Sequence, residues 1–361
     1  MSSEIIQNDL YARITELLQA ARQNVVRAVN QTMVYTYFEI GRMIIEEEQQ
    51  GKERAAYGKQ ILKEISIKLT KGFGKGFSID NLENMRRFFL AYSISETTSR
   101  KSDLISIIQK SYVDLKQVKK YDKETHTFTL SWSHYIKLMR IQNVAERSFY
   151  EIECAANNWS LNELQRQFNS GLYERLALSR DKDGIKKLAE KGQIIEKPMD
   201  ILKDPYILEF LNLPEHHQYS ESDLETAIID KLEHFLLELG KGFTFVGRQV
   251  RMTIDEKHFR VDLVFFNRLL KCFVVIDLKI GELTHQDIGQ MQMYVNYHDR
   301  IVKLPDENKT IGIILCKDKS QTLVEITLPK NNDQIFASRY QTILPDKQTF
   351  MRLLDDNEIG N

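Results

Sequence analysis

Residues 260–279, RVDLVFFNRLLKCFVVIDLK, decide the fold of the second half of this 361-residue chain. Two apolar runs rich in Val, Phe and Ile flank a short polar break at Asn267 and Arg268, which predicts a β-hairpin with mostly buried strands. Three charged residues are set into those runs: Asp262, Asp277 and Lys279. Because an unpaired charge in a buried strand costs much free energy, their placement indicates a functional site.

The chemistry of these residues indicates a metal site. Side chains alternate along a strand, so Asp277 and Lys279 share one face while Leu278 takes the other. Mg²⁺ prefers oxygen ligands, and we expect Asp262, Asp277 and the backbone carbonyl of Leu278 to bind it. Lys279 can then orient or help deprotonate the water that attacks a phosphodiester. The alternative is structural: Asp277 pairs with Lys279, and Asp262 is solvated at a strand end.

Further candidate residues lie on the neighbouring segments. A helix over 223–239, capped by Ser222, carries Glu225 as a further acid, and residues 243–254 alternate as a strand. A helix over 284–296 carries Gln290 and Tyr294, four residues apart on one face, to position substrate or water. With a strand at 310–316, this order predicts an α/β domain. Arg248, Arg251 and Arg260 add cationic groups on the strands.

The first half of the chain is predicted to be helical. Apolar residues recur near a 3.6-residue period over 10–50 and 54–69, and Gly41 interrupts the first run, as a close helix contact requires. The sequence KGFGKGFS (71–78) then predicts a tight turn. It lacks the spacing of a phosphate-binding loop, and no strand precedes it. A helix capped by Ser78 or Asp80 follows, with one buried face formed by Leu82, Met85, Phe89 and Tyr92.

Helix, glycine turn and helix together resemble a helix-turn-helix. Lys and Arg outnumber Asp and Glu between residues 52 and 92. Lys75, Arg86 and Arg87 are therefore candidates for contact with nucleic-acid phosphates; the alternative is a solvated helical pair that packs against protein. His134 in LSWSHY has no catalytic partner at a recognisable spacing, so we interpret it as structural.

A charge-rich segment with Pro198 and Pro205 marks a boundary. We predict a helical domain over 1–176, a linker over 177–205 and an α/β domain over 206–361. A further helix is expected around 104–118, and the adjacent His216 and His217 are interpreted as surface residues.

The overall composition names no partner. The net charge is −1, and 28% charged with 42% hydrophobic residues is ordinary for a globular protein. The three cysteines show no C-x-x-C spacing, which favours buried thiols in a reducing compartment. No apolar run reaches the roughly 18 residues of a membrane span, and no secretory signal is seen, so the cytoplasm is expected.

The order of motifs resembles the PD-(D/E)XK nuclease core: Asp262 on one strand, Asp277-Leu278-Lys279 on the next, and Gln290 to Tyr294 on the following helix. The whole chain is similar to the YhcG-type nuclease proteins through the stretches YGKQIL, LTKGFGKGFS, LSWSHY, KGQIIEKP, YSESDLE, LGKGFTFVGRQ and GQMQMY. This resemblance implies a helical N-terminal domain joined to a Mg²⁺-dependent nuclease fold, in which Mn²⁺ can substitute. Val261 replaces the proline of the first motif, and Asp277 stands where glutamate is common.

Two hypotheses about function follow. The first is an endonuclease that hydrolyses phosphodiester bonds and leaves a 5′-phosphate as the family fold implies. DNA is favoured as its substrate, and the sequence does not exclude RNA. The second is a nucleic-acid-binding or complex-forming protein with a weak or silent nuclease fold. Cutting both strands of a duplex needs two active sites, which makes a homodimer an option.

Overall fold

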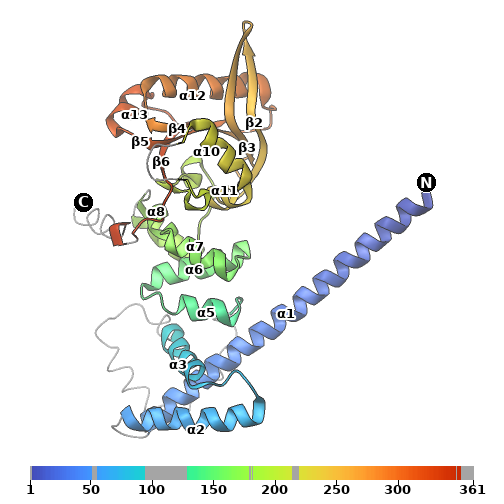
Figure 1. Ribbon diagram of the computed structural model, residues 1–361, viewed down its shortest axis with the longest axis vertical. Helices are drawn as coiled ribbons and strands as arrows, with labels where there is room; N and C mark the ends of the chain where they lie inside the picture. Colours follow the sequence, from blue (N-terminus) through green and yellow to red (C-terminus); the bar gives the residue numbers. More distant parts are fainter. Residues whose placement is uncertain are drawn as a thin grey trace. The chain divides into compact units, whose positions relative to one another are not determined.

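The computed structural model describes residues 2–50, 55–93, 128–178, 180, 182–213, 219–346 and 348–350 (Figure 1). The chain forms two compact units, Met1–Leu164 and Gln165–Asn361. The helix expected around 104–118 lies outside the described residues, and so do His216 and His217. The sequence-based limits 1–176, 177–205 and 206–361 stay a prediction. No helix within these described ranges combines the length and the hydropathy needed to cross a membrane.

The first unit is all-helical over the residues that the structure describes, as the sequence predicts. Its helices up to residue 157 are α1 (Ser2–Gln50), α2 (Ala55–Phe73), α3 (Ile79–Ser93), α5 (Trp132–Leu138) and α6 (Val144–Asn157). The long α1 is seen end to end in Figure 1.

Helix α3 packs closely on α1. A Cβ atom at Gly41 would lie 2.1 Å from the backbone oxygen of Met85, so the close helix contact expected at this glycine is confirmed. The buried face of α3 differs from the prediction at one position: Phe88 is 0% exposed and replaces Phe89, which is half-buried. Phe88 is drawn inward because its ring lies among other aromatic rings, 5.6 Å from Phe38 and 5.0 Å from Phe128.

The glycine turn connects α2 to α3. Helix α2 continues to Phe73, four residues beyond its predicted end, and Gly74 and Gly76 then take positive φ values of 84° and 120°. Ser78 caps α3 by accepting a hydrogen bond from the backbone N–H of Asn81, 3.2 Å away. The structural interpretation of His134 is confirmed, because its ring nitrogens lie 2.7 Å from Ser131 Oγ and 3.1 Å from the Trp159 carbonyl.

The second unit is a mixed sheet with helices on both faces. Its described residues form six strands, which lie in the order β1-β6-β5-β4-β3-β2. They span β1 (Tyr206–Ile207), β2 (Phe243–Ile254), β3 (Lys257–Asn267), β4 (Cys272–Glu282), β5 (Ile311–Asp318) and β6 (Ile335–Gln341). The helices from residue 161 onward are α7 (Leu161–Asn169), α8 (Leu172–Leu178), α9 (Lys182–Lys191), α10 (Glu221–Asp230), α11 (Leu232–Leu239), α12 (His285–Tyr297) and α13 (Gln321–Thr327). Short helical turns occupy η2 (Pro198–Ile201), η3 (Glu209–Leu211) and η4 (His298–Val302).

The side chains of β4 alternate between the two faces of the sheet, and each face is covered by a layer of helices. Ile276 and Leu278 pack in the cluster that contains α10 and α11, whereas Val275 packs in the cluster that contains α12. β4 is antiparallel to β3 and parallel to β5, and β5 is parallel to β6. The carboxyl ends of β4, β5 and β6 therefore share one edge of the sheet.

Three details of this unit correct the sequence prediction. The helix expected over 223–239 is two helices, because the chain leaves the helical region at Lys231, and Ser220 rather than Ser222 caps the first of them. Strands β1 and β6 were not predicted. They pair with each other in parallel through Tyr206 and Tyr340, across a long stretch of sequence.

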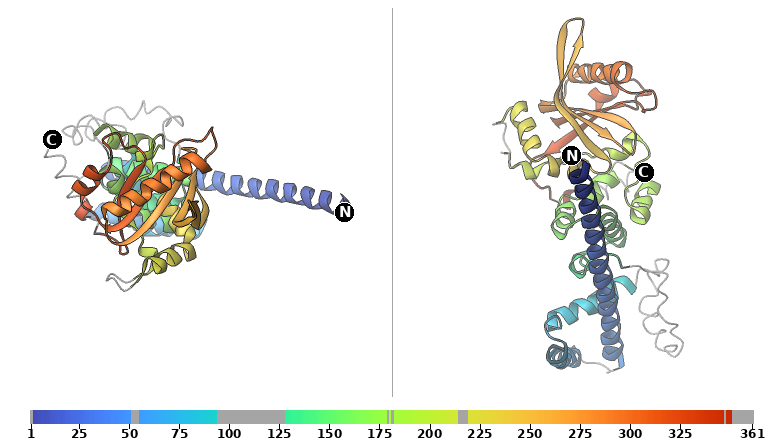
Figure 2. Two further views of the ribbon diagram at one scale, coloured as in Figure 1. Left: turned by 90° about the horizontal axis from the view of Figure 1, so that it is seen from above. Right: turned by 90° about the vertical axis from the view of Figure 1, so that its right-hand side faces the viewer.

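The hairpin of β2 and β3 extends beyond the sheet. The β3–β4 ladder ends at Leu263 and Ile276, whereas β2 and β3 remain paired as far as Ile254 and Lys257. The result is the two-stranded arm that is visible in Figure 1 and in the right-hand view of Figure 2.

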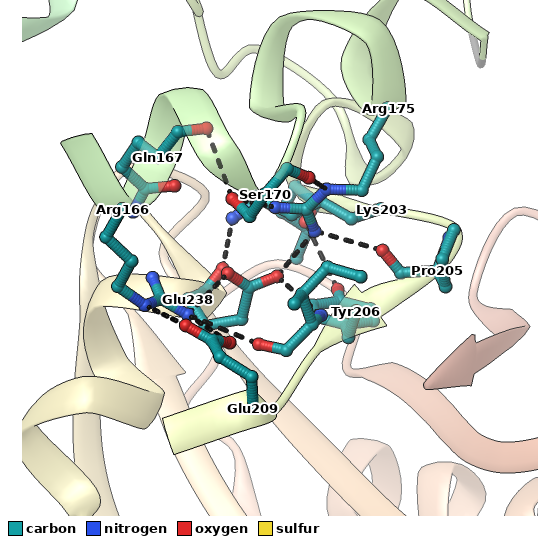
Figure 3. A network of polar contacts seen from close by, with 11 residues as sticks. Arg166, Gln167, Ser170, Arg175, Lys203, Pro205, Tyr206, Glu209 and Glu238 are labelled. Carbon is teal, nitrogen blue, oxygen red and sulfur yellow. Dashed lines mark hydrogen bonds and ion pairs between the residues drawn. The ribbon is translucent and has the colours of Figure 1, made fainter. Parts of the chain in front are cut away.

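A buried polar network centred on Glu238 joins α8, β1 and α11 (Figure 3). Glu238 is 0% exposed, and its Oε1 accepts hydrogen bonds from Arg175 Nη1 at 2.6 Å and from the N–H of Ile207 at 3.0 Å. Arg166 donates to Oε2 at 3.3 Å, and the Lys203 ammonium donates to the Glu238 backbone carbonyl. Burial alone raises the pKa of Glu238, but the surrounding cations outweigh burial and lower that pKa to about 2.

Candidate active site at the fork of two strands

Strands β3 and β4 separate where two acids would otherwise face each other. Their last pair is Leu263 with Ile276, so the same register places Asp262 opposite Asp277. Like charges directly opposite on paired strands repel. The Asp262 carboxylate occupies the fork instead: its Oδ2 accepts a hydrogen bond from the backbone N–H of Leu278 at 2.8 Å. At this point a hydrogen bond from the backbone to a side chain takes the place of the backbone hydrogen bonds that pair β3 with β4.

Asp277 is buried beside Lys279 at the fork. Asp277 is 2% exposed, and its Oδ2 lies 2.9 Å from Lys279 Nζ. Apart from this ion pair, that enclosed oxygen has no hydrogen-bond partner among the described residues. Burial raises the pKa of Asp277 to about 7; the nearby charge of Asp262 also raises it, while Lys279 opposes the shift. The two residues share a face, as strand alternation predicts.

Lys279 has two further acidic neighbours that sequence reasoning missed. Its Nζ lies 3.7 Å from Glu221, in the first turn of α10, and 3.9 Å from Asp287, in the first turn of α12. Burial lowers the pKa of Lys279, but the carboxylates around it outweigh burial, so that pKa is raised. The missed signal for Glu221 was its spacing: it lies one helical turn before Glu225, and so on the same face of α10.

Glu225 reaches the site through a residue that the sequence did not single out. Glu225 is 8% exposed and accepts a hydrogen bond from the side-chain amide of Gln249. The same Nε2 donates to Asp262 Oδ1 at 3.0 Å. Gln249 alternates as an ordinary polar strand residue, so the pattern of β2 carried no sign of this role.

Gln290 and Tyr294 lie behind the fork. The Tyr294 side chain is 1% exposed, and its hydroxyl donates to the backbone carbonyl of Arg260 at 2.9 Å while accepting from the Gln290 amide. Burial raises the pKa of Tyr294, and the charges of Asp277 and Asp262 raise it further. The pair therefore ties α12 to β3 immediately beside the two acids.

The five basic candidates differ in their contacts. Arg86 and Arg87 are ion-paired, at 2.7 Å to Glu48 and 2.6 Å to Glu83. Arg248, paired with Leu263 at the base of the arm, and Arg260, on the arm, are exposed and have no carboxylate partner within the described ranges. Lys75, in the glycine turn, is exposed.

The cross-strand register of the arm places Arg260 opposite Arg251. The guanidinium of Arg251 lies 2.7 Å from His258 Nε2. Like charges paired across strands reduce stability, so this basic pair favours an anionic partner from outside the chain.

The donors at the fork fit a hard divalent cation. In the part of the chain that the structure describes, no three acidic, histidine or cysteine side chains lie close enough together to hold a metal. Mg²⁺ does not require three, because it is usually held by one or two carboxylates and keeps several waters. Asp262 and Asp277 supply two carboxylates, and the enclosed Oδ2 of Asp277 would gain a partner from a bound cation.

Comparison with known proteins agrees with this geometry. Residues 199–355 match the YhcG PDDEXK nuclease domain, and residues 13–175 match the DUF1016 N-terminal domain. The second unit is thus a PD-(D/E)XK domain that follows a helical N-terminal region, which confirms the fold expected from the sequence. The chain is 41% identical over 347 residues to a protein of Escherichia coli (strain K12) named "Putative nuclease YhcG", with 95% of this chain and 91% of that protein covered. The chain belongs to the YhcG family of nuclease-domain proteins.

Two solved structures show more distant likeness. A repair endonuclease from Pyrococcus abyssi is 15% identical with a TM-score of 0.23, over 37% of this chain and 50% of that one. EndoMS in its apo form is 16% identical with a TM-score of 0.23, over 36% of this chain and 49% of that one. The aligned part of this chain spans about half the length of these two proteins.

Proposed function

We propose that this protein is a metal-dependent endonuclease that hydrolyses phosphodiester bonds in DNA, with Mg²⁺ as its cofactor and Mn²⁺ as a substitute. One observation carries the proposal: Asp262 and Asp277 meet at the fork of β3 and β4, with the Lys279 ammonium 2.9 Å from Asp277. Two acids and a lysine brought together where the pairing of β3 and β4 ends reduce the stability of the fold. Hydrolysis of a phosphodiester uses this combination of groups.

The residues have distinct roles in this proposal. Asp262, Asp277 and the backbone carbonyl of Leu278 would hold the cation, which supplies Lewis acidity and an activated water. Lys279 offsets negative charge on the phosphate and orients the attacking water. Its contacts with Glu221 and Asp287 keep its flexible side chain at the fork.

Gln290 and Tyr294 hold strand β3 in place beside the two acids. Tyr294 donates to the carbonyl of Arg260, two residues before Asp262, and so fixes the strand that carries this acid. Gln290 in turn donates to the Tyr294 hydroxyl. We propose that this pair positions the strand and the water around it.

The arm is the proposed contact with the nucleic-acid backbone. Arg248 and Arg260 are exposed and have no carboxylate partner among the described residues, whereas Arg86 and Arg87 already neutralise glutamates. Phosphate contacts by arginine are independent of sequence, so these residues would add affinity for DNA of any sequence. Lys75 is a second, exposed contact from the glycine turn.

Cleavage assays test the activity. The wild-type protein should nick supercoiled plasmid and cut labelled duplex oligonucleotides with Mg²⁺ or Mn²⁺, and EDTA should stop both reactions. Asp277→Asn should abolish cleavage, and Lys279→Ala should slow it by roughly 10²–10³-fold, as expected when one group that stabilises transition-state charge is removed. A matched control is the exposed ion pair between Lys309 and Asp333, 3.9 Å apart, where Lys309→Ala should leave cleavage unchanged.

The outcome separates the two functional hypotheses. Undiminished cleavage by both active-site variants would overturn the assignment of the site. DNA binding without any cleavage by the wild type would favour a silent nuclease fold. Binding should depend on the arm in either case: Arg260→Ala should weaken affinity for all sequences alike and reduce the salt slope of binding by about one.

A further inference from the structure

The backbone of Gln249 is unusual for a strand residue. It lies inside β2 with φ at +49°, in the left-handed region that non-glycine residues avoid. A register shift between Phe245 and Gly247 precedes it. The pairs on either side, Arg248 with Leu263 and Val250 with Val261, place Gln249 opposite Asp262. Strain of this kind persists only where surrounding contacts enforce it, and it is concentrated at functional sites.

From this backbone position the side chain of Gln249 forms hydrogen bonds to two acids on different elements. Its Nε2 donates to Glu225 on α10 and to Asp262 on β3, the latter at 3.0 Å. The atom assignment follows from chemistry, because carboxylates only accept and the amide nitrogen has two protons to give. The amide Oε1 has no hydrogen-bond partner among the described residues.

This bridge fixes both oxygens of the Asp262 carboxylate. Oδ2 is held by the N–H of Leu278 and Oδ1 by Gln249, so the carboxylate plane is set from two sides. Without the amide, Glu225 and Asp262 would be two like charges with no donor between them, and repulsion would turn them apart. The neutral amide therefore allows Glu225 and Asp262 to lie near each other at the fork.

We propose that Gln249 is a positioning residue of the metal site, whose amide orients Asp262 and recruits Glu225 to the fork. This inference rests on the proposed function. Partners that orient metal-binding side chains typically contribute 10–100-fold to metal affinity. The two carboxylate contacts that hold the Gln249 side chain then account for its strained backbone.

Gln249→Gly provides a sharp test, because glycine takes a positive φ without strain but lacks the amide. Titration calorimetry with Mn²⁺ on the full-length protein should show a dissociation constant raised by about 10–100-fold relative to wild type. Glu225→Gln should also weaken binding, and the two effects should not add in the double variant, because both act through one bridge. The matched control is Glu256→Gly, at the tip of the same hairpin with φ at +63°, which should bind Mn²⁺ as the wild type does.

A purely structural role would give a different result. If Gln249 serves only the fold, Gln249→Gly would keep the wild-type affinity for Mn²⁺ whatever its melting temperature in EDTA. That result would overturn the positioning role and leave the proposed metal site intact. Failure of the wild-type protein to bind Mn²⁺ at all would overturn both. A melting curve and a far-ultraviolet circular dichroism spectrum of each variant establish that it is folded.

Discussion

The buried carboxylate of Glu238 makes a large and pH-dependent contribution to the stability of the nuclease unit. Replacing it by Glu238→Gln keeps the shape of the side chain and removes its charge. Arg175, also 0% exposed, then keeps its bonds to Ser170 and Pro205 but loses its carboxylate partner. Removing one member of a buried pair is strongly destabilising because the remaining charge stays buried.

The magnitude follows from the pKa of Glu238, which falls from 4.5 to about 2 on folding. Each pKa unit corresponds to about 1.4 kcal/mol, so the ionised form of Glu238 contributes about 3 kcal/mol at pH 7. Since the folded pKa is the lower one, this contribution is present above pH 4.5 and is lost as the pH falls toward 2. At pH 3.5 it should have decreased to roughly 2 kcal/mol.

Urea unfolding of wild type and Glu238→Gln at pH 7 and pH 3.5 measures this contribution. Circular dichroism follows the whole chain, whereas Trp132 and Trp159, the two tryptophans of the chain, both lie in the first unit. Their fluorescence therefore reports on the first unit and is recorded as a separate signal. Glu233→Gln, at an exposed position on the same helix, is the matched control and should shift stability little. A difference between wild type and Glu238→Gln below about 1 kcal/mol, or one that does not shrink at low pH, would refute the reasoning.

Three further substitutions test the packing around the helices and the site. Gly41→Ala would place a Cβ atom 2.1 Å from the Met85 carbonyl oxygen, so tryptophan fluorescence should show the helical unit destabilised by at least about 1–3 kcal/mol. Gly312→Ala would place a Cβ atom 2.5 Å from Met291 Sδ, and circular dichroism should show a loss of about 1–3 kcal/mol in the second unit; wild-type stability would contradict the close packing of α12 on β5. Tyr294→Phe removes the donor to the β3 backbone and should lower stability in EDTA by about 1 kcal/mol or more, with slower cleavage at saturating Mg²⁺.

Local pattern predicted the strands at the centre of the sheet well. The strand predicted over 243–254 has the bounds of β2, although its alternation breaks at Gln249 and Val250. The two apolar runs of the opening stretch became β3 and β4. These strands are joined by short turns, so neighbouring residues determine their pairing. Strands β1 and β6 were missed because β1 has two residues, and Ser338 and Arg339 interrupt the apolar pattern of β6.

The candidate site was predictable in its chemistry and only partly in its members. Asp262, Asp277 and Lys279 stand out because each is a charge within an apolar run. Glu221 and Gln249 do not, since each looks like a surface residue of its own element. Their place in the site depends on how α10 and β2 pack against the fork, which is a tertiary property that no local pattern records.

The balance of charge at the fork argues for a role beyond stability. Among the described residues, five carboxylates take part in its contacts, at residues 221, 225, 262, 277 and 287, and Lys279 supplies an ammonium. The register would place Asp262 directly opposite Asp277, but the pairing of β3 and β4 ends one residue before this position. Both acids are therefore present at the cost of a shorter strand pair. A fold under selection for stability alone would replace such a cluster with apolar side chains at little cost or with a gain. The carboxylates at the fork outnumber the nearby cations, and an exposed basic arm lies beside them. A bound cation would neutralise the carboxylates, and a polyanion would neutralise the arm.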